Sequence, residues 1–452
     1  MAANDPSKVS ATSHFVRVDE RFVPESRMHQ LARARLRAFL LAHPRLFWTI
    51  TPLYRSGRRV LAHAALRLSH TPTDRFLQVD RLVWVSPSQI EFTALIKGST
   101  LRGLGNGWVL DGDWDTPKLP FARDKRYRSV RDVITESKPW QETEEYANAS
   151  RSIEAGLTAW YCSTREELDE RCRTLDCLIE KIRSEGYLSQ KELRSRPSRE
   201  ATLGTGDEIT VAIGRHGDVF FRDGAHRLAM AKELGLSRIP VHVAIRHSQW
   251  QELRREIGRY ADDHGGRVPQ PLSHADLEDI PALCRCDARC RLVVDSLPAT
   301  GTVLDLTPGW GYFCHRLEDR GYTCTALEPP RDAMHFLTRL RRASHRQFTI
   351  TPKSTLTSSG DTAVTFDAGL VLSDGLDSRT RPSTAELLAQ LATVRVRELF
   401  VEPDAFAGRS IAPPAETSAS ELFLGELSAA TGLQKRSRLG ATAEAGPLYR
   451  LH

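Results

Sequence analysis

The chain has 452 residues, of which 40% are hydrophobic, and this is enough for two or three domains with real cores. Its formal net charge of +6 is modest for the length and does not by itself indicate a nucleic-acid-binding protein. No run approaches the ~18 to 20 apolar residues that a membrane-spanning helix needs. The eight cysteines are scattered, which favours a reducing cytoplasm over a secreted disulfide framework.

Residues 1–88 form a basic N-terminal extension whose hydrophobic spacing predicts helices. Arginines recur between Arg27 and Arg67, with tryptophan and phenylalanine interleaved, and no acidic residue lies between Glu25 and Asp74. This composition suits amphipathic helices on an anionic membrane surface, so residues 27–68 are candidates for peripheral membrane contact. A helical extension packed on the next domain is the alternative. Nucleic acid is disfavoured as a partner, since no nucleic-acid motif accompanies the charge.

Three aspartates follow a short predicted strand at residues 108–110. Asp111, Asp113 and Asp115 alternate, so on an extended chain their carboxylates would point to one side and could hold Mg²⁺ or a polyol. The spacing is not that of a calcium EF-hand, because Thr116 stands where that loop needs glycine. A polar turn with no bound ion is the alternative. Further along, the apolar spacing predicts a long helix over residues 165–185.

A strand, tight turn, strand and helix are predicted over residues 209–235. Asp223 is the predicted N-cap of the helix, and Gly224, His226 and Arg227 follow at its start. Unpaired N–H groups and the helix dipole favour an anion there. Arg227 can bind phosphate oxygens with two nitrogens, and His226 can donate a hydrogen bond or move a proton. The alternative is a capped helix with His226 and Arg227 in solvent.

Over residues 207–247 the sequence resembles the ParB/sulfiredoxin superfamily, whose members bind nucleotide phosphates at an Asp-Gly-x-His-Arg turn. The resemblance implies that Asp223, Gly224, His226 and Arg227 bind ATP, CTP or ADP with Mg²⁺. Some relatives by fold are kinases of small metabolites. The implied activity is therefore phosphoryl transfer to a small hydroxylated metabolite or a glycan precursor, or nucleotide hydrolysis.

Within that resemblance, Asp223, His226 and Arg227 are the candidate catalytic residues. Glu208, or the neighbouring Asp207, is a candidate metal ligand or base. Ala225 replaces the reactive cysteine of sulfiredoxin, which argues strongly against that reductase chemistry. No helix-turn-helix of the chromosome-partition proteins is recognisable, which disfavours a sliding DNA clamp.

A second signature begins with a predicted strand at residues 302–305. Asp305 is followed by a turn that contains Gly309 and Gly311, and the next strand ends in Glu328, about 20 positions further on. The pattern resembles class I S-adenosylmethionine-dependent methyltransferases. The resemblance implies that Asp305, Gly309 and Gly311 line the amino-acid part of the cofactor and that Glu328 binds its ribose.

The glycine motif of this second signature is degenerate. Thr307 stands at its first glycine, and a side chain there weakens cofactor binding unless something compensates. Cofactor binding and a scaffold that has lost its cofactor are both open. Cys284, Cys286 and Cys290 could bind zinc with His274 as the nearest fourth ligand, but their spacing differs from that of ordinary zinc sites and a helix is the better interpretation.

We therefore predict an α/β protein with three parts. These are a helical extension (1–88), an α+β ParB/sulfiredoxin-like module (89–272) and a Rossmann-like, doubly wound methyltransferase-like domain (273–452). The predicted function is nucleotide-dependent phosphoryl transfer or hydrolysis. Alternatives are a methyltransferase whose first module recognises substrate, and a non-catalytic, nucleotide-switched scaffold or DNA-binding ParB-like protein.

Overall fold

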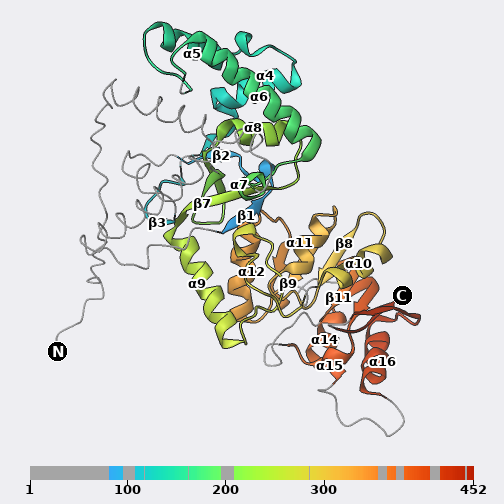
Figure 1. Cartoon of the computed structure of the whole chain (residues 1–452). Coiled ribbons are helices and arrows are strands. Elements are labelled where there is room, and N and C mark those ends of the chain that lie inside the picture. The colour runs from blue at the N-terminus through green and yellow to red at the C-terminus, as the bar shows by residue number, and fades with distance from the viewer. Residues whose placement is uncertain are drawn as a thin grey trace, which may run out of the picture. The chain divides into compact units, whose positions relative to one another are not determined.

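The computed structural model describes residues 81–94, 107–116, 118–160, 162–194, 208–284, 286–354, 364–372, 381–407, 418–442 and 445–452. The chain forms two compact units, unit 1 (Met1–Gln251) and unit 2 (Glu252–His452) (Figure 1). Residues 1–80 of the basic N-terminal extension lie outside the described residues, and so does Asp207. No helix in the described ranges is both long enough and apolar enough to cross a bilayer.

The sequence predicts a domain boundary at residue 272, whereas the compact units divide within helix α9 (Ser248–Asp263). The second half of α9 packs on unit 2. The Tyr260 ring lies 5.0 Å from that of Trp310 and 5.9 Å from that of Phe336, and Glu256 accepts a hydrogen bond from His335 at 2.9 Å. Residues 252–272, which the sequence analysis assigns to the first module, therefore belong to unit 2.

Unit 1 is built on a mixed seven-stranded sheet with the order β1-β7-β5-β6-β2-β4, and β3 also pairs with β7. β7 pairs in parallel with β5, and β5 pairs antiparallel with β6, as the predicted hairpin requires. β1 and β3 pair with successive halves of β7. The strands are β1 (Leu82–Val85), β2 (Phe92–Thr93), β3 (Trp108–Leu110), β4 (Leu119–Pro120), β5 (Ile209–Ile213), β6 (Val219–Asp223) and β7 (Ile239–His247).

Helix α8 (Ala225–Glu233) connects this sheet to the helices of unit 1, because it contacts β5 and also α4 and α6 (Figure 1). α6 (Arg165–Glu185) has the predicted bounds: Thr164 accepts a hydrogen bond from the Glu167 N–H, and Gly186 ends the helix with φ 77°. The remaining helices are α4 (Lys125–Thr135), α5 (Glu144–Glu154) and α7 (Gln190–Arg194), with short 3₁₀ helices η2 (Pro87–Gln89), η3 (Phe121–Arg123) and η4 (Trp140–Glu142).

Unit 2 contains a sheet with the order β10-β9-β8-β11-β12-β14-β13. The first five strands are parallel, and β14 runs antiparallel to both β12 and β13. The strands are β8 (Thr302–Asp305), β9 (Thr323–Leu327), β10 (Thr349–Thr351), β11 (Val364–Val371), β12 (Val394–Val401), β13 (Arg436–Thr442) and β14 (Ala445–Leu451). This doubly wound order confirms the predicted Rossmann-like, methyltransferase-like fold.

Helices cover both faces of this sheet, so its central strands are buried on each side. Neighbouring residues of one strand belong to opposite cores: Val303 packs in one cluster and Leu304 in the other. The first core includes residues of α10 (Asp287–Ser296), α11 (Tyr312–Glu318) and α12 (Arg331–Ala343), and the second includes residues of α14 (Thr384–Leu391), α15 (Asp404–Ala407) and α16 (Ala419–Thr431). A 3₁₀ helix, η6 (Ala275–Leu277), precedes them.

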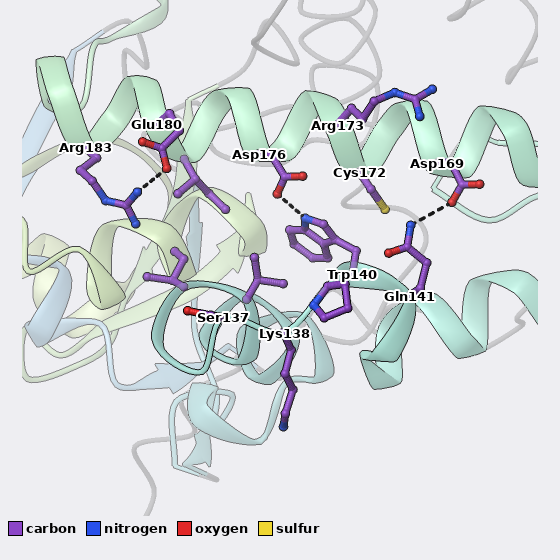
Figure 2. A pocket seen from close by; sticks show the side chains of 14 residues that line it. Ser137, Lys138, Trp140, Gln141, Asp169, Cys172, Arg173, Asp176, Glu180 and Arg183 are labelled. Atoms are coloured by element: carbon purple, nitrogen blue, oxygen red, sulfur yellow. Dashed lines mark hydrogen bonds and ion pairs between the residues drawn. The ribbon is translucent and has the colours of Figure 1, made fainter.

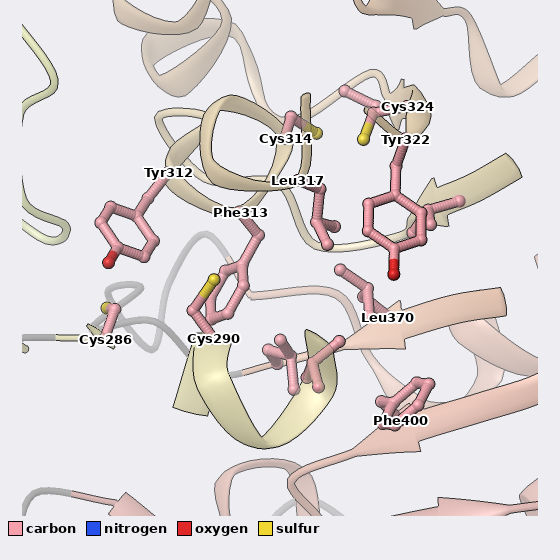
Figure 3. Close-up of a cluster of buried hydrophobic side chains, with 14 of the residues drawn as sticks. Cys286, Cys290, Tyr312, Phe313, Cys314, Leu317, Tyr322, Cys324, Leu370 and Phe400 are labelled. Atoms are coloured by element: carbon pink, nitrogen blue, oxygen red, sulfur yellow. The ribbon is translucent and has the colours of Figure 1, made fainter. Parts of the chain in front are cut away.

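The cysteines of unit 2 are packing residues of the first core (Figure 3). Cys290 and Cys314 lie among Phe313, Leu370 and other apolar side chains, and all the cysteines are free thiols. No group of three potential metal ligands occurs in the described part of the chain, and His274 instead caps η6. The zinc alternative therefore finds no support among the described residues, and the preferred helix is observed as α10 (Asp287–Ser296), which contains Cys290.

A buried ion pair ties α10 to the carboxyl end of β12, and it yields a stability prediction. Arg289 and Glu402 are 2% and 1% exposed, and their side chains are 2.5 Å apart. We expect Glu402→Ala to lower the free energy of unfolding by about 3 to 5 kcal/mol, because it leaves a buried guanidinium without its carboxylate. Denaturant unfolding measures this loss.

The matched control is Glu421→Ala, which removes the exposed partner of Arg436. It should cost no more than about 1 kcal/mol. Equal costs for the two variants would contradict the role given to the buried pair.

Candidate functional site

The first candidate site lies at the carboxyl ends of the parallel strands of unit 2. The strand order reverses its direction at β8, whose neighbours are β9 and β11. Open α/β sheets bind ligands at such a switch point, outside the carboxyl ends of the strands. Asp305 ends β8 and leads into the glycine turn, while Glu328 follows β9. The sheet therefore brings the predicted cofactor residues to one edge.

The buried side chain of Asp305 stabilises the glycine turn by hydrogen bonds. Its side chain accepts hydrogen bonds from the Thr307 N–H at 3.1 Å and from the Cys314 thiol at 3.6 Å, and it is 2% exposed. Burial raises the pKa of Asp305 to about 7, against the opposing effect of these two hydrogen bonds. Asp305 is thus a structural acid of the turn and is shielded from solvent.

Gln270 fills the inner side of the glycine turn. Its Oε1 accepts hydrogen bonds from the Trp310 N–H at 2.8 Å and the Tyr312 N–H at 3.3 Å, and its Nε2 donates to the Pro308 carbonyl at 3.3 Å. A Cβ on Gly309, where φ is 55°, would lie 2.8 Å from that Nε2. Glycine at 309 therefore makes room for Gln270, a contact that no local sequence pattern predicts because the two segments are about 40 residues apart.

Thr307, the residue that replaces the first glycine of the motif, turns its side chain toward β11. Its hydroxyl donates to the Leu372 carbonyl and accepts from the Leu372 N–H, both at 2.9 Å. The hydroxyl thus bonds the segments after β8 and β11 to each other. The hydroxyl of this side chain is therefore hydrogen-bonded within the protein.

Glu328 is the half-buried acid beside this turn. Its backbone N–H donates to the Thr351 carbonyl at 2.9 Å, while its carboxylate has no hydrogen-bond or ion-pair partner among the described residues. Next to the turn, the Trp310 ring stacks on Phe336 with centroids 4.2 Å apart. Glu328 is therefore the predicted cofactor residue that remains available to a ligand.

The second candidate site is the start of α8 in unit 1. Asp223 belongs to β6, and the N-cap of α8 is Gly224, with φ 92°. The prediction of Asp223 as the N-cap is wrong: its carboxylate accepts a hydrogen bond from the Gly224 N–H at 2.8 Å, and no side chain caps the helix. A Cβ on Gly224 would lie 3.2 Å from Ile209 Cα, so the backbone needs glycine there.

Arg227 and Glu208 share a buried environment near this helix start. Arg227 is 8% exposed and donates to the Tyr187 hydroxyl at 3.4 Å, while Glu208, 4% exposed, accepts from the Gln190 N–H at 2.5 Å. Burial raises the pKa of Tyr187, and the charges of both Arg227 and Glu208 act on it. The structure thus brings these two predicted residues to the same tyrosine.

His226 lies in the first turn of α8 and bonds a carboxylate that the sequence analysis missed. Its Nε2 is 3.0 Å from Glu145 Oε2, and Glu145 is 1% exposed. The imidazole meets Trp160 and Trp140 edge to face, with centroids 5.2 and 6.5 Å away. No local sequence pattern singles out Glu145, because its partner lies 81 residues away.

Trp140 also borders a cavity of about 660 Å³ that lies between η4 and α6 (Figure 2). The Trp140 Nε1 donates to Asp176 at 2.7 Å, and Gln141 donates to Asp169 at 3.3 Å. Several other charges on the cavity wall pair with neighbouring side chains, as Arg183 does with Glu180. The cavity and the α8 site therefore share Trp140 as a common wall.

The three aspartates Asp111, Asp113 and Asp115 do not converge on a metal position. Asp113 and Asp115 both accept hydrogen bonds from Arg215, at 2.8 and 2.7 Å, and Asp111 accepts from Ser248 at 2.9 Å. Asp115 is buried and also accepts from the Arg215 backbone N–H at 2.7 Å. Since no three potential metal ligands gather anywhere in the described ranges, we correct this prediction to an arginine-bound turn.

No family model and no curated protein matches the chain. Among solved structures, the bifunctional kinase-methyltransferase WbdD matches with 17% identity over 43% of this chain and 45% of its own, with a TM-score of 0.29. PH0226 from Pyrococcus horikoshii OT3 matches with 15% identity over 37% of this chain and 88% of its own, with a TM-score of 0.26.

A SAM-dependent methyltransferase from Methanosarcina mazei matches with 13% identity over 35% of this chain and 94% of its own, with a TM-score of 0.25. The chain spans less than half of the length of the WbdD structures. The fold assignment rests on strand order and turn geometry, which define unit 2 as a methyltransferase-like Rossmann unit.

The raised pKa of Asp305 predicts how stability varies with pH. The unfolded chain releases this proton near the ordinary value of 3.8, whereas the folded protein keeps it up to about 7. The contribution of Asp305 to stability is therefore full below pH 4 and is lost as the pH rises toward 7, by about 1.4 kcal/mol per pH unit. Asp305→Asn lacks this titration.

Denaturant unfolding of both proteins at pH 4.5, 6 and 7.5 measures the effect. The free energy of unfolding of the wild type minus that of Asp305→Asn should fall as the pH rises, and the other titrating groups cancel in this difference. A difference that stays constant would refute the protonated, buried state of Asp305.

Proposed function

We propose that unit 2 binds S-adenosylmethionine and that the protein transfers its methyl group to a small-molecule or glycan-type acceptor. One observation carries the proposal: Glu328 follows β9 beside the switch point, with a carboxylate that has no partner among the described residues, next to a glycine turn. A free carboxylate at this position can accept hydrogen bonds from both ribose hydroxyls.

The residues fit the cofactor in part. Glu328 would bind the ribose, and the turn at Gly309 and Gly311 would face the amino-acid part, while the cofactor supplies an activated methyl group. Gln270 already bonds the Trp310 and Tyr312 N–H groups, so those donors are available only if Gln270 moves. The ribose contact is therefore the main contribution of the described residues to affinity.

Glu328→Gln tests this proposal. We expect it to weaken S-adenosylmethionine binding by about 10- to 100-fold, because a charged acceptor contributes roughly 1.5 to 3 kcal/mol to its hydrogen bonds. Isothermal titration calorimetry on the full chain gives the affinities. Glu426→Gln, on the exposed side of α16, is the matched control and should bind like the wild type. Absence of binding to the wild-type protein would overturn the proposal.

A second function is favoured by the start of α8. This helix has no side-chain cap, and Arg227 and His226 lie in its first turn. Unpaired N–H groups, the helix dipole and a guanidinium together suit the phosphates of a nucleotide. We propose that ATP, CTP or ADP binds there with Mg²⁺ and is hydrolysed or donates a phosphoryl group to a small hydroxylated acceptor.

Arg227→Ala tests the nucleotide site. Magnesium complexes of ATP or CTP at about 100 times Kd should raise the Tm of the wild type by roughly 5 to 10 °C, and Arg227→Ala should lose most of this shift. Arg183→Ala, on the exposed part of α6, is the control. Arg227→Lys keeps a positive charge at this buried position. Comparing it with Arg227→Ala therefore distinguishes a loss of nucleotide binding from a loss of folding. A full shift in Arg227→Ala would exclude this site.

A further inference from the structure

We propose that Glu145 and His226 form an acid–base pair, in which Glu145 positions His226 to accept a proton from a hydroxyl group of a substrate. The proposal rests on the nucleotide site at the start of α8 and assigns the group that activates the phosphoryl acceptor. His226 would be the catalytic residue, and Glu145 its positioning residue.

The burial of the two side chains differs as such a pair requires. Glu145 is 1% exposed, whereas the His226 side chain is 21% exposed and reaches solvent. Within the described part of the chain, only Oε2 of Glu145 is bonded, to His226 Nε2 at 3.0 Å, and Oε1 has no hydrogen-bond partner there. A buried carboxylate with a free oxygen is costly unless it is paired, so the bond to His226 is its main compensation.

The carboxylate is held in place by its own helix. Glu145 lies in the first turn of α5, where Thr143 is the N-cap and the helix dipole favours a negative charge. The Glu145 N–H donates to the Ser129 hydroxyl at 3.2 Å, which ties this turn to α4. The nearby guanidinium of Arg126 bonds both oxygens of Asp124, at 2.9 and 2.6 Å, so it is engaged elsewhere.

This arrangement fixes the tautomer of the imidazole. A carboxylate can only accept, so the neutral His226 donates its Nε2–H to Glu145 and keeps the lone pair on Nδ1. Nδ1 has no hydrogen-bond partner among the described residues, and the edges of Trp140 and Trp160 limit rotation of the ring. A neutral imidazole with a free Nδ1 and a buried carboxylate behind it is a general base.

The proposed step transfers the terminal phosphoryl group of the nucleotide to the hydroxyl group of the acceptor. Nδ1 of His226 takes the hydroxyl proton while the hydroxyl oxygen forms a bond to the terminal phosphorus of the nucleotide. The bond from that phosphorus to the bridging oxygen breaks, and the nucleoside diphosphate leaves with the electron pair. Glu145 stabilises the resulting imidazolium, which then releases its proton to solvent. Arg227 and the N–H groups of α8 hold the phosphates throughout.

Glu145→Gln in the full chain tests the pair. The amide oxygen still accepts the Nε2–H bond but the charge is lost, so we expect nucleotide turnover with magnesium ATP or CTP to fall about 100-fold. The nucleotide affinity, measured by calorimetry, should change less than about threefold. Glu144→Gln removes an adjacent exposed carboxylate that pairs with Arg128, and this control should keep wild-type turnover.

A spectroscopic measurement separates positioning from mere structure. ¹⁵N NMR of the imidazole, assigned by comparison with His226→Gln, should show the Nε2–H tautomer in the wild type and a mixture in Glu145→Ala. Wild-type turnover in Glu145→Gln, an equal loss of affinity and turnover, or an unchanged tautomer in Glu145→Ala would each overturn the pair. A wild-type protein that binds no nucleotide would instead overturn the nucleotide site, and this proposal with it.

Discussion

The hydrogen bonds of Gln270 to the glycine turn are the constraint on which the functional edge of unit 2 depends. The turn joins β8 to α11, and its N–H and carbonyl groups are buried, so each needs a partner. Gln270 supplies an acceptor for two N–H groups and a donor for one carbonyl. Thr307 bonds the turn to Leu372, and Asp305 fills its interior. Groups of the protein itself therefore supply the hydrogen-bond partners of this turn.

The start of α8 in unit 1 is built on the opposite principle. No described side chain caps this helix, and several polar groups around it bond one another. Glu145 pairs with His226, and Asp124 pairs with Arg126. Asp223 accepts a hydrogen bond from the Gly224 N–H. Among the described residues, the first N–H groups of this helix therefore have no side-chain acceptor, unlike those of the glycine turn.

The sequence predicts those features that depend on neighbouring residues. The strand at β5, the bounds of α6 and the glycine turn after β8 are local patterns, and the structure confirms each. The partners that define the two sites are not local. Arg215 reaches Asp115 across 100 residues, and His226 reaches Glu145 across 81. No periodicity encodes such pairs. For that reason the alternation of Asp111, Asp113 and Asp115 left a metal site open as one interpretation, and the sequence does not predict the roles of Glu145 and Gln270. Asp223 was misplaced because β6 continues through it, so that Gly224, the residue able to adopt a positive φ, becomes the cap.

The chemistry of Gln270 also limits how a cofactor can enter the turn. A primary amide presents an acceptor and a donor side by side, and the amino-acid part of S-adenosylmethionine presents the same pair as a carboxylate and an ammonium group. The two would therefore compete for the Trp310 N–H and the Pro308 carbonyl. Displacing Gln270 would break its hydrogen bonds to the turn, at a cost of roughly 1 to 3 kcal/mol unless the segment moves. Contact with Glu328 carries no such cost, because no described group bonds its carboxylate. A ligand whose hydroxyl groups donate to Glu328 would therefore bind this edge without disturbing the turn.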